Sequence, residues 1–297
     1  MLTESDTTSP PGTAAAPVRR RGAAYAWRRR LHSTWVALLA WAAALVFFFP
    51  VAWMFVSGFK READASTDPP AFVFTPTLDQ FEAILGRDFT PFLLNSLMAS
   101  IGSTILVIVL ATPAAYALSL APVGRWRDSL FFFISTRFMP PAAIILPLYI
   151  IANNVGVLDN ATMLSLVYTA MNLPIAVWMI RSFLLEVPTA VLEAAKVDGA
   201  GFFTEVRKII LPMIAPGLAA TALICFIFAW NEFFFAVSLT STRAATVPVF
   251  LTGFITSEGL FLARLSAAAT MAAFPVILAG WIAQKWLVRG LTLGAVK

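Results

Sequence analysis

Two ionisable residues stand inside long apolar runs of this 297-residue sequence, and they are the first candidates for chemistry. Glu232 belongs to "AWNEFFFA", where it follows Trp230 and Asn231. A carboxylate, an amide and an aromatic ring supply the planar hydrogen-bonding groups and the apolar face that recognise a polyhydroxylated solute. Consecutive helical residues spread around the helix, so we assign Trp230 to packing and expect Asn231 and Glu232 to border a solute cavity. The alternative is a hydrogen bond that Glu232 accepts from a helix of a partner chain.

Arg137, in "STRFMPP", is the second ionisable candidate, and it also allows two interpretations. Pro140 and Pro141 cannot donate backbone hydrogen bonds, so the carbonyls of Thr136 and Arg137 are expected to be free and the helix to kink. The guanidinium can satisfy those carbonyls or extend to the surface, or it can line a solute path. Counted from the predicted helix ends, Arg137 and Glu232 differ in depth by roughly 18 Å, which predicts two separate sites.

No catalytic constellation accompanies these residues. The sequence has no Gly-x-x-x-x-Gly-Lys-Ser/Thr phosphate loop and no Ser/His/Asp set. Its one histidine, His32, follows three arginines and is expected at the surface. Its one cysteine, Cys225, lies in an apolar run, which excludes disulfides and cysteine-based metal sites within the chain. We therefore expect no catalytic residue, no metal site and no cofactor here; the chain alone is not an enzyme.

Composition shows which elements must position the candidates. Apolar residues make up 59% of the chain and charged residues only 12%, which indicates a polytopic membrane protein. The net charge of +5 gathers in an N-terminal arginine cluster and not in a nucleic-acid-binding patch. Each predicted span approaches or exceeds the ~20 residues that cross a bilayer, and backbone in lipid must be helical, so the fold class is all-α. The predicted spans are 35–58, 92–120, 129–152, 162–185, 212–240 and 264–288.

The distribution of Lys and Arg predicts the orientation of the six spans. Basic residues concentrate in the N-terminal tail, in the 121–128 and 181–211 loops and in the C-terminal tail, which places both termini in the cytoplasm. The opposite loops are poorer in basic residues, and the first of them, about 60–91, is acidic and contains a predicted short helix, 78–85. Residues 1–30 are predicted to be a disordered basic cytoplasmic tail, and 31–297 one membrane domain.

The cytoplasmic loop 186–212 between spans four and five is unusually polar for this chain. It reads "EVPTAVLEAAKVDGAGFFTEVRKIILP", and Pro188 suits the first turn of a helix that Gly199 can end in left-handed geometry. A second helical piece is predicted from Phe202 to Leu211. The loop could be an ordinary connector at the membrane surface, or a partner could dock on it, because the small residues Ala194, Ala195 and Gly199 allow close approach.

The order "EAA", two residues, "DGA", ten residues, "LP" resembles the signature loop of ABC-importer permease subunits. Further stretches ("NSLMAS", "AYALSL", "MPPAAIILPLY") resemble the carbohydrate branch, which includes the second permease of maltose importers. The C-terminal "SEGLFLARLSAAATMA" and "QKWLVRGLTLGAVK" are most similar to permeases of sorbitol and mannitol importers. The resemblance implies that 186–212 contains a coupling helix that docks on an ATPase; its matching residues are Glu193, Ala194, Ala195, Asp198 and Gly199.

The resemblance further implies a subunit of a bacterial inner-membrane importer for a sugar or sugar alcohol. Its partners would be a second homologous permease, two ATPase subunits that bind ATP and Mg²⁺, and an external solute-binding protein; nucleic acid is not expected. The rival interpretation is a self-sufficient secondary transporter. That class needs acidic coupling-ion ligands, and often repeated halves, whereas only Glu232 qualifies and no repeat is visible.

Overall fold

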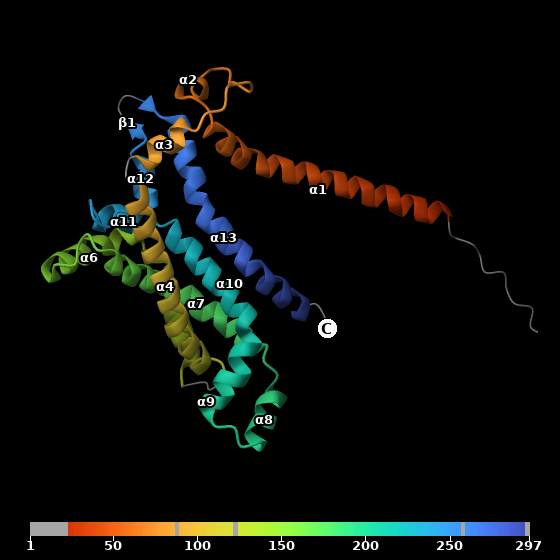
Figure 1. Cartoon of the computed structure of the whole chain (residues 1–297). Helices are drawn as coiled ribbons and strands as arrows, with labels where there is room; N and C mark the ends of the chain where they lie inside the picture. Colours follow the sequence, from red (N-terminus) through yellow and green to blue (C-terminus); the bar gives the residue numbers. More distant parts are fainter. Residues whose placement is uncertain (1–22, 87–88, 121–123, 257–258, 295–297) are drawn as a thin grey trace, which may run out of the picture. The chain divides into compact units, whose positions relative to one another are not determined.

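The computed structural model describes residues 23–86, 89–120, 124–256 and 259–294, and this part of the chain is almost wholly helical (Figure 1). Its only strands, β1 (Ile255–Thr256) and β2 (Gly259–Leu260), form one short antiparallel pair. The predicted all-α fold class is confirmed. Residues 1–22 of the expected disordered tail lie outside the described residues, and residues 23–30 belong to a helix.

The chain divides into two compact units, Met1–Trp53 and Met54–Lys297. The first contains most of α1 (Ala23–Ser57), whose part Thr34–Ser57 is long and apolar enough to cross a membrane. Apolar residues occupy all sides of this helix, as expected of a segment in contact with lipid. Phe49 and Trp53 stack along it with ring centroids 6.0 Å apart.

Four long helices form the centre of the second unit (Figure 1). Helix α4 (Phe89–Ala117) packs along α7 (Ala161–Leu185), and α10 (Leu211–Trp230) packs against α4, α7 and α13 (Leu262–Gly294). Small residues permit close approach: a Cβ at Gly102 would lie 2.9 Å from Ser165 Oγ, and one at Gly217 would collide with the Phe183 ring. Within the described residues five helices can span a membrane, or six if the bent pair α5–α6 counts as one span.

The third predicted span, 129–152, is broken. Helix α5 (Trp126–Arg137) and α6 (Pro141–Val155) meet at 87°. The expected kink is thus close to a right angle, because Pro140 and Pro141 stop the helical hydrogen-bond ladder. The expectation that Thr136 keeps a free carbonyl was wrong: the Met139 N–H donates to it at 3.3 Å.

The fifth predicted span, 212–240, is shifted towards the N-terminus. Helix α9 (Phe202–Glu205), a π-helical turn (Val206–Ile210) and α10 form one apolar run of 29 residues that ends at Trp230. A short break follows, and α11 (Phe234–Leu239) begins a separate helix. Asn231 and Glu232 therefore lie at a helix break and not within a continuous span.

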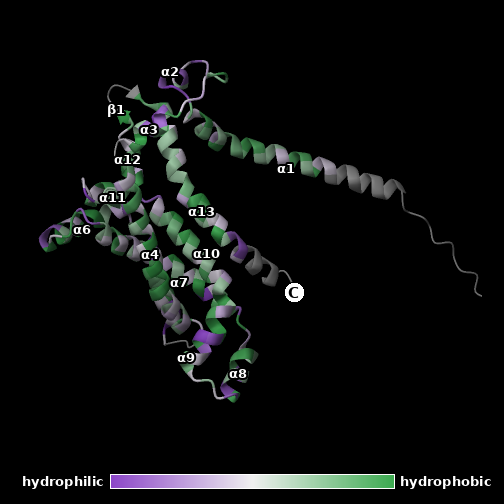
Figure 2. Ribbon diagram, viewed as in Figure 1, coloured by the Kyte–Doolittle hydropathy of each residue, from purple (hydrophilic) through white to green (hydrophobic). Residues whose placement is uncertain are grey.

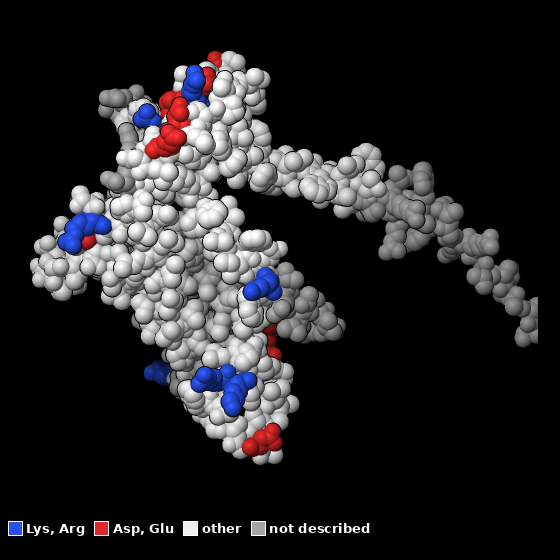
Figure 3. All heavy atoms as spheres, viewed as in Figure 1, with Lys and Arg blue, Asp and Glu red and all other residues white. Residues whose placement is uncertain are grey.

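The two ends of the second unit carry its polar elements (Figure 2), and charged side chains gather mainly there (Figure 3). One end holds α2 (Glu62–Ala65), α3 (Asp79–Leu85) and α12 (Val247–Thr252). Helix α3 agrees with the helix predicted at 78–85. The other end holds α8 (Thr189–Val197) and α9.

The first loop after α1 caps a distant helix. The N–H groups of Ala263 and Arg264 donate to the Glu62 carboxylate at 3.0 and 3.3 Å. Glu62 thus supplies an acceptor for N–H groups that have none within the first turn of α13. Lys60 is buried beside this cap, and its ammonium donates to the Ala71 carbonyl at 2.8 Å. Burial lowers the pKa of Lys60, although Asp64 acts in the opposite direction.

Candidate coupling loop and solute path

The polar loop folds as the sequence predicts, with small differences at its ends. Pro188 is the N-cap of α8 and precedes its first residue, Thr189. At the other end Gly199 has φ +76°, its N–H donates to the Lys196 carbonyl, and the Ala200 N–H donates to the Ala195 carbonyl at 2.9 Å. These paired bonds form a Schellman motif, which a left-handed glycine permits. The sequence "DGA" is therefore a helix stop.

The two faces of α8 differ in exposure. Leu192 and Ala195 are buried against the protein, whereas Glu193, Ala194 and Asp198 are exposed. Ala195 was expected to admit a partner surface; its side chain instead faces inward, one turn from Leu192. Among the three residues of "EAA", a partner can therefore reach only Glu193 and Ala194.

Three exposed apolar side chains, at the end of α8 and just after it, were missed by sequence reasoning. Val197 is 87% exposed, Phe203 72% and Phe202 64%, and the Phe202 ring meets Tyr116 edge-on at 5.5 Å. Exposed apolar groups next to a polar helix are typical of an interaction surface. The adjacent phenylalanines after "GAG", in a loop that is polar otherwise, were the signal that could have revealed them.

Glu232 has a local structural partner. Its carboxylate accepts hydrogen bonds from the N–H groups of Phe235, at 3.0 and 3.1 Å, and Ala236, at 3.2 Å, and so caps the start of α11. Asn231 is exposed and donates through Nδ2 to the Ile227 carbonyl at 2.8 Å, which leaves Oδ1 available. Trp230 is buried and stacks on Phe226, with centroids 5.8 Å apart.

Arg137 contacts two other helices. Its Nη1 donates to the Met171 carbonyl of α7 at 2.8 Å, and its guanidinium lies over the Phe228 ring of α10, 5.4 Å from the centroid. Phe228 lies two residues before the end of α10 at Trp230, and Glu232 follows in the break. The contact brings Arg137 to the part of α10 that precedes Glu232, and the predicted 18 Å difference in depth stays a prediction. No ion pair joins Arg137 to Glu232 within the described residues.

Two further polar residues lie one turn apart on α7 near these groups. Tyr168 and Asn172 are almost fully buried, and neither the Tyr168 hydroxyl nor Asn172 Oδ1 has a hydrogen-bond partner in the described residues. Asn172 Nδ2 donates to the Cys225 carbonyl of α10 at 3.3 Å. The polar groups of α5, α7 and the α10–α11 break thus gather in one region. No cluster of three or more His, Cys, Asp or Glu side chains that could hold a metal ion occurs in the described residues.

A bundle of membrane-spanning helices with broken spans, internal polar groups and an exposed polar loop defines a membrane permease. The chain belongs to the binding-protein-dependent transport system inner membrane component family, which matches residues 108–293. It is a multi-pass inner-membrane permease subunit of an ABC importer, and ATP hydrolysis belongs to a partner ATPase. This membership removes the rival interpretation of a self-sufficient transporter.

Full-length relatives support the assignment. A probable ABC transporter permease of Sinorhizobium fredii is 38% identical over 255 residues, which cover 86% of this chain and 92% of the relative. A trehalose transport system permease of Mycobacterium tuberculosis is 34% identical over 252 residues, 84% and 92% of the two chains. A chain of the solved bacterial importer of the acidic polysaccharide alginate has the same fold: TM-score 0.69, 21% identity, 86% of this chain and 96% of that chain.

Proposed function

We propose that the solute of this importer is a sugar or a sugar alcohol. The observation that carries the proposal is the gathering of amide, hydroxyl, carboxylate and guanidinium groups beside aromatic rings at the two helix breaks, which suits a polyhydroxylated molecule. The relative that transports trehalose supports the same solute class. Because the sequence also resembles sorbitol and mannitol permeases, the proposed solute class includes the alditols.

Within this proposal Asn231, Glu232 and Arg137 border the solute path. Asn231 is exposed and offers Oδ1 to a hydroxyl group. Glu232 shapes the path chiefly by capping α11, because three N–H bonds already occupy its carboxylate. Arg137 holds the α5–α6 break against α7 and α10, and Tyr168 and Asn172 add polar atoms behind these residues.

Energy reaches the path through α8. A second permease of the same family completes the pathway, and two ATPase subunits, which bind ATP and Mg²⁺, each hold one coupling helix. Glu193, Ala194 and Asp198 present the polar part of the docking surface and Val197 and Phe203 its apolar part; Gly199 fixes the end of the helix. Nucleotide shifts the assembly between two states only because it binds one of them more tightly.

The sidedness follows from the Lys and Arg bias, with both termini and α8 in the cytoplasm. Single cysteines at Ser66 and Lys196, both exposed, test it in a Cys225→Ala background. An impermeant thiol reagent applied to intact cells with a permeabilised outer membrane should label position 66 and spare position 196. Labelling of 196 alone would reverse the topology.

The solute class is tested by uptake in cells that express the complete importer. Radiolabelled trehalose is competed with unlabelled maltose, sorbitol, mannitol and methionine. We expect at least one sugar or alditol to compete and methionine to have no effect. Competition by none of the carbohydrates, or no uptake of a labelled panel of them, would overturn the proposed solute class.

A further inference from the structure

One carboxylate, 82 residues earlier in the chain than Ser241, binds the segment between α11 and α12, Ser241–Ala245. The N–H groups of four consecutive residues, Ser241 to Ala244, donate to Asp159 at 2.9, 3.2, 3.0 and 2.9 Å. Asp159 itself adopts φ +54°, and its N–H donates to the Leu239 carbonyl at 3.0 Å. Burial raises the pKa of the Asp159 carboxyl, but the four N–H bonds lower it by more, to about 2.

Helix α4 holds the same segment as well. Asn95 Nδ2 donates to the carbonyls of Arg243 and Ala245, each at 3.0 Å. The Val247 N–H, at the start of α12, donates to Ser96 Oγ at 2.8 Å. Side chains from two distant elements thus pair with the backbone N–H and C=O groups of this segment. These bonds offset the entropy that the exposed segment loses on ordering.

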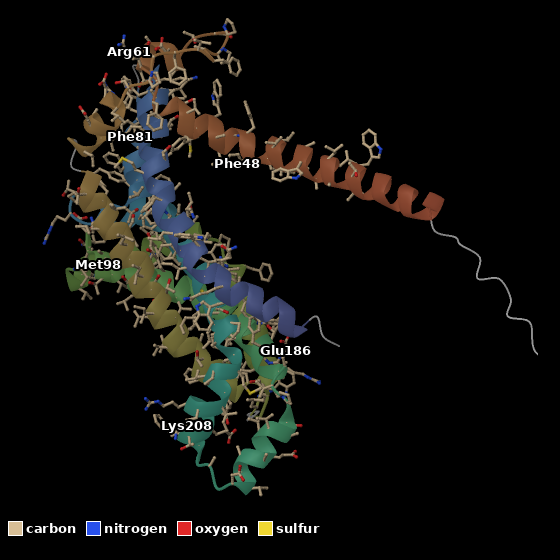
Figure 4. The ribbon with its side chains drawn as sticks, turned by 45° about the vertical axis from the view of Figure 1, so that its right-hand side comes forward. Phe48, Arg61, Phe81, Met98, Glu186 and Lys208 are labelled. Atoms are coloured by element: carbon tan, nitrogen blue, oxygen red, sulfur yellow. The ribbon has the colours of Figure 1, made fainter. Side chains whose placement is uncertain are left out.

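The Arg243 side chain takes no part in this scaffold. It is exposed, and no hydrogen bond or ion pair holds its guanidinium in the described part of the chain. Beside it lies a hollow of about 240 Å³ whose polar lining includes Asn95, Asn160 and Thr162. Met98, labelled in Figure 4, forms its apolar wall. Because the Asp159 charge is satisfied by N–H donors, the guanidinium is the group that remains to attract a partner.

We propose that Arg243, presented by the segment 241–245, is a docking contact for a carboxylate on the external solute-binding protein. The proposal rests on the proposed function, which places this end of α7 outside the cell. An arginine on a pre-organised backbone loses little freedom on binding, and arginine is enriched among the residues that dominate interfaces. A carboxylate complements the charge of the Arg243 guanidinium, and such complementarity also accelerates encounter.

The test measures the ATPase activity of the reconstituted complex against the concentration of the importer's own solute-binding protein, loaded with the sugar found by uptake competition. Arg243→Glu should raise about tenfold the concentration of solute-binding protein that gives half-maximal ATPase activity. The ATPase rate at saturating binding protein should be retained. Arg243→Gln should raise the half-maximal concentration about threefold and should weaken its dependence on salt, since one attractive charge is lost. Arg61→Glu is the matched control: Arg61 is exposed at the α2 end (Figure 4) and should change the value less than about twofold.

The outcomes separate the two proposals. If the binding protein fails to stimulate the wild-type complex, the proposed function fails and the docking contact fails with it. If stimulation is normal and Arg243→Glu behaves like Arg61→Glu, the docking contact alone is wrong and Asp159 merely ties two loops together. A purely structural role also predicts that Arg243→Gln leaves the salt dependence unchanged, because its side chain makes no contact in the scaffold.

Discussion

The guanidinium of Arg137 lies over the ring of Phe228 at 5.4 Å and donates to the Met171 carbonyl at 2.8 Å. One side chain therefore joins the end of α5 to both α10 and α7. This contact occurs where the third span turns by 87°, a point at which irregular backbone needs support from neighbouring helices. Arg137 thus has a structural function in this conformation, whether or not solute also reaches it.

The Arg137–Phe228 contact should contribute measurably to stability. A double-mutant cycle of Arg137→Met and Phe228→Leu, followed by denaturation of the purified permease in detergent, should give a coupling energy of about 0.5–2 kcal/mol. Arg137→Lys retains the charge but not the planar stack, so it should recover only part of this energy. A coupling energy indistinguishable from zero would show that the contact does not stabilise the bend.

Gly199 should tolerate asparagine better than valine. Its φ of +76° is accessible to Asn and unfavourable for a β-branched residue, and no atom within 4 Å would obstruct an added Cβ. We expect Gly199→Val to abolish uptake while the protein still inserts, and Gly199→Asn to keep at least about half of the uptake. Co-purification with the ATPase and uptake are measured together. Equal uptake by the two variants would mean that the helix stop does not matter for coupling.

Glu232 provides a test of the solute path. Glu232→Gln keeps an oxygen that can cap α11, so the complex should assemble while uptake or its pH dependence changes. Glu232→Leu removes the cap, at a cost of about 1 kcal/mol, and should reduce uptake more strongly than it reduces assembly. If Glu232→Leu leaves uptake intact, or if the protein disappears from the membrane, Glu232 has no role in the path.

The Asp159 clamp should fail only in strong acid. The pKa of Asp159 in the folded protein, about 2, lies below its ordinary value of 3.8, so its stabilisation is complete above pH ~4 and is lost as the pH falls towards 2. Asp159→Asn should therefore lower the free energy of unfolding at pH 6 by on the order of 1–2 kcal/mol. The difference from wild type should shrink below pH ~3. Asp68→Asn, at an exposed position, is the matched control. A constant difference across this pH range would exclude ionisation of Asp159 as the cause.

The elements that depend on local pattern could be predicted from the sequence. Apolar runs of bilayer length predicted the spans. Pro188 and Gly199 predicted α8 to within a residue at each end. The breaks were harder to place. Pro140 and Pro141 indicated a kink, but the angle depends on how α6 packs against α11, and no proline marks the end of α10 at Trp230.

Contacts between distant segments could not be predicted from one sequence. Asp159 meets Ser241 across 82 residues, and Glu62 meets Ala263 across 201. Each is a side chain that satisfies backbone N–H groups, and such a bond imposes no pattern on the residue types that donate. The exposure of Arg243 and the inward orientation of Ala195 likewise depend on tertiary packing. Functional groups at such positions become visible only in the folded chain.

ATP-dependent solute accumulation would show whether this chain is the permease of an ATP-driven importer. The complex is purified through a tag on this chain and reconstituted in proteoliposomes with ATP and Mg²⁺ on the α8 side and the solute-binding protein on the other. We predict that an ATPase co-purifies and that a radiolabelled sugar or alditol accumulates only when ATP is hydrolysed. Accumulation that persists without ATP and collapses with an ionophore, or a pure complex without an ATPase, would contradict it.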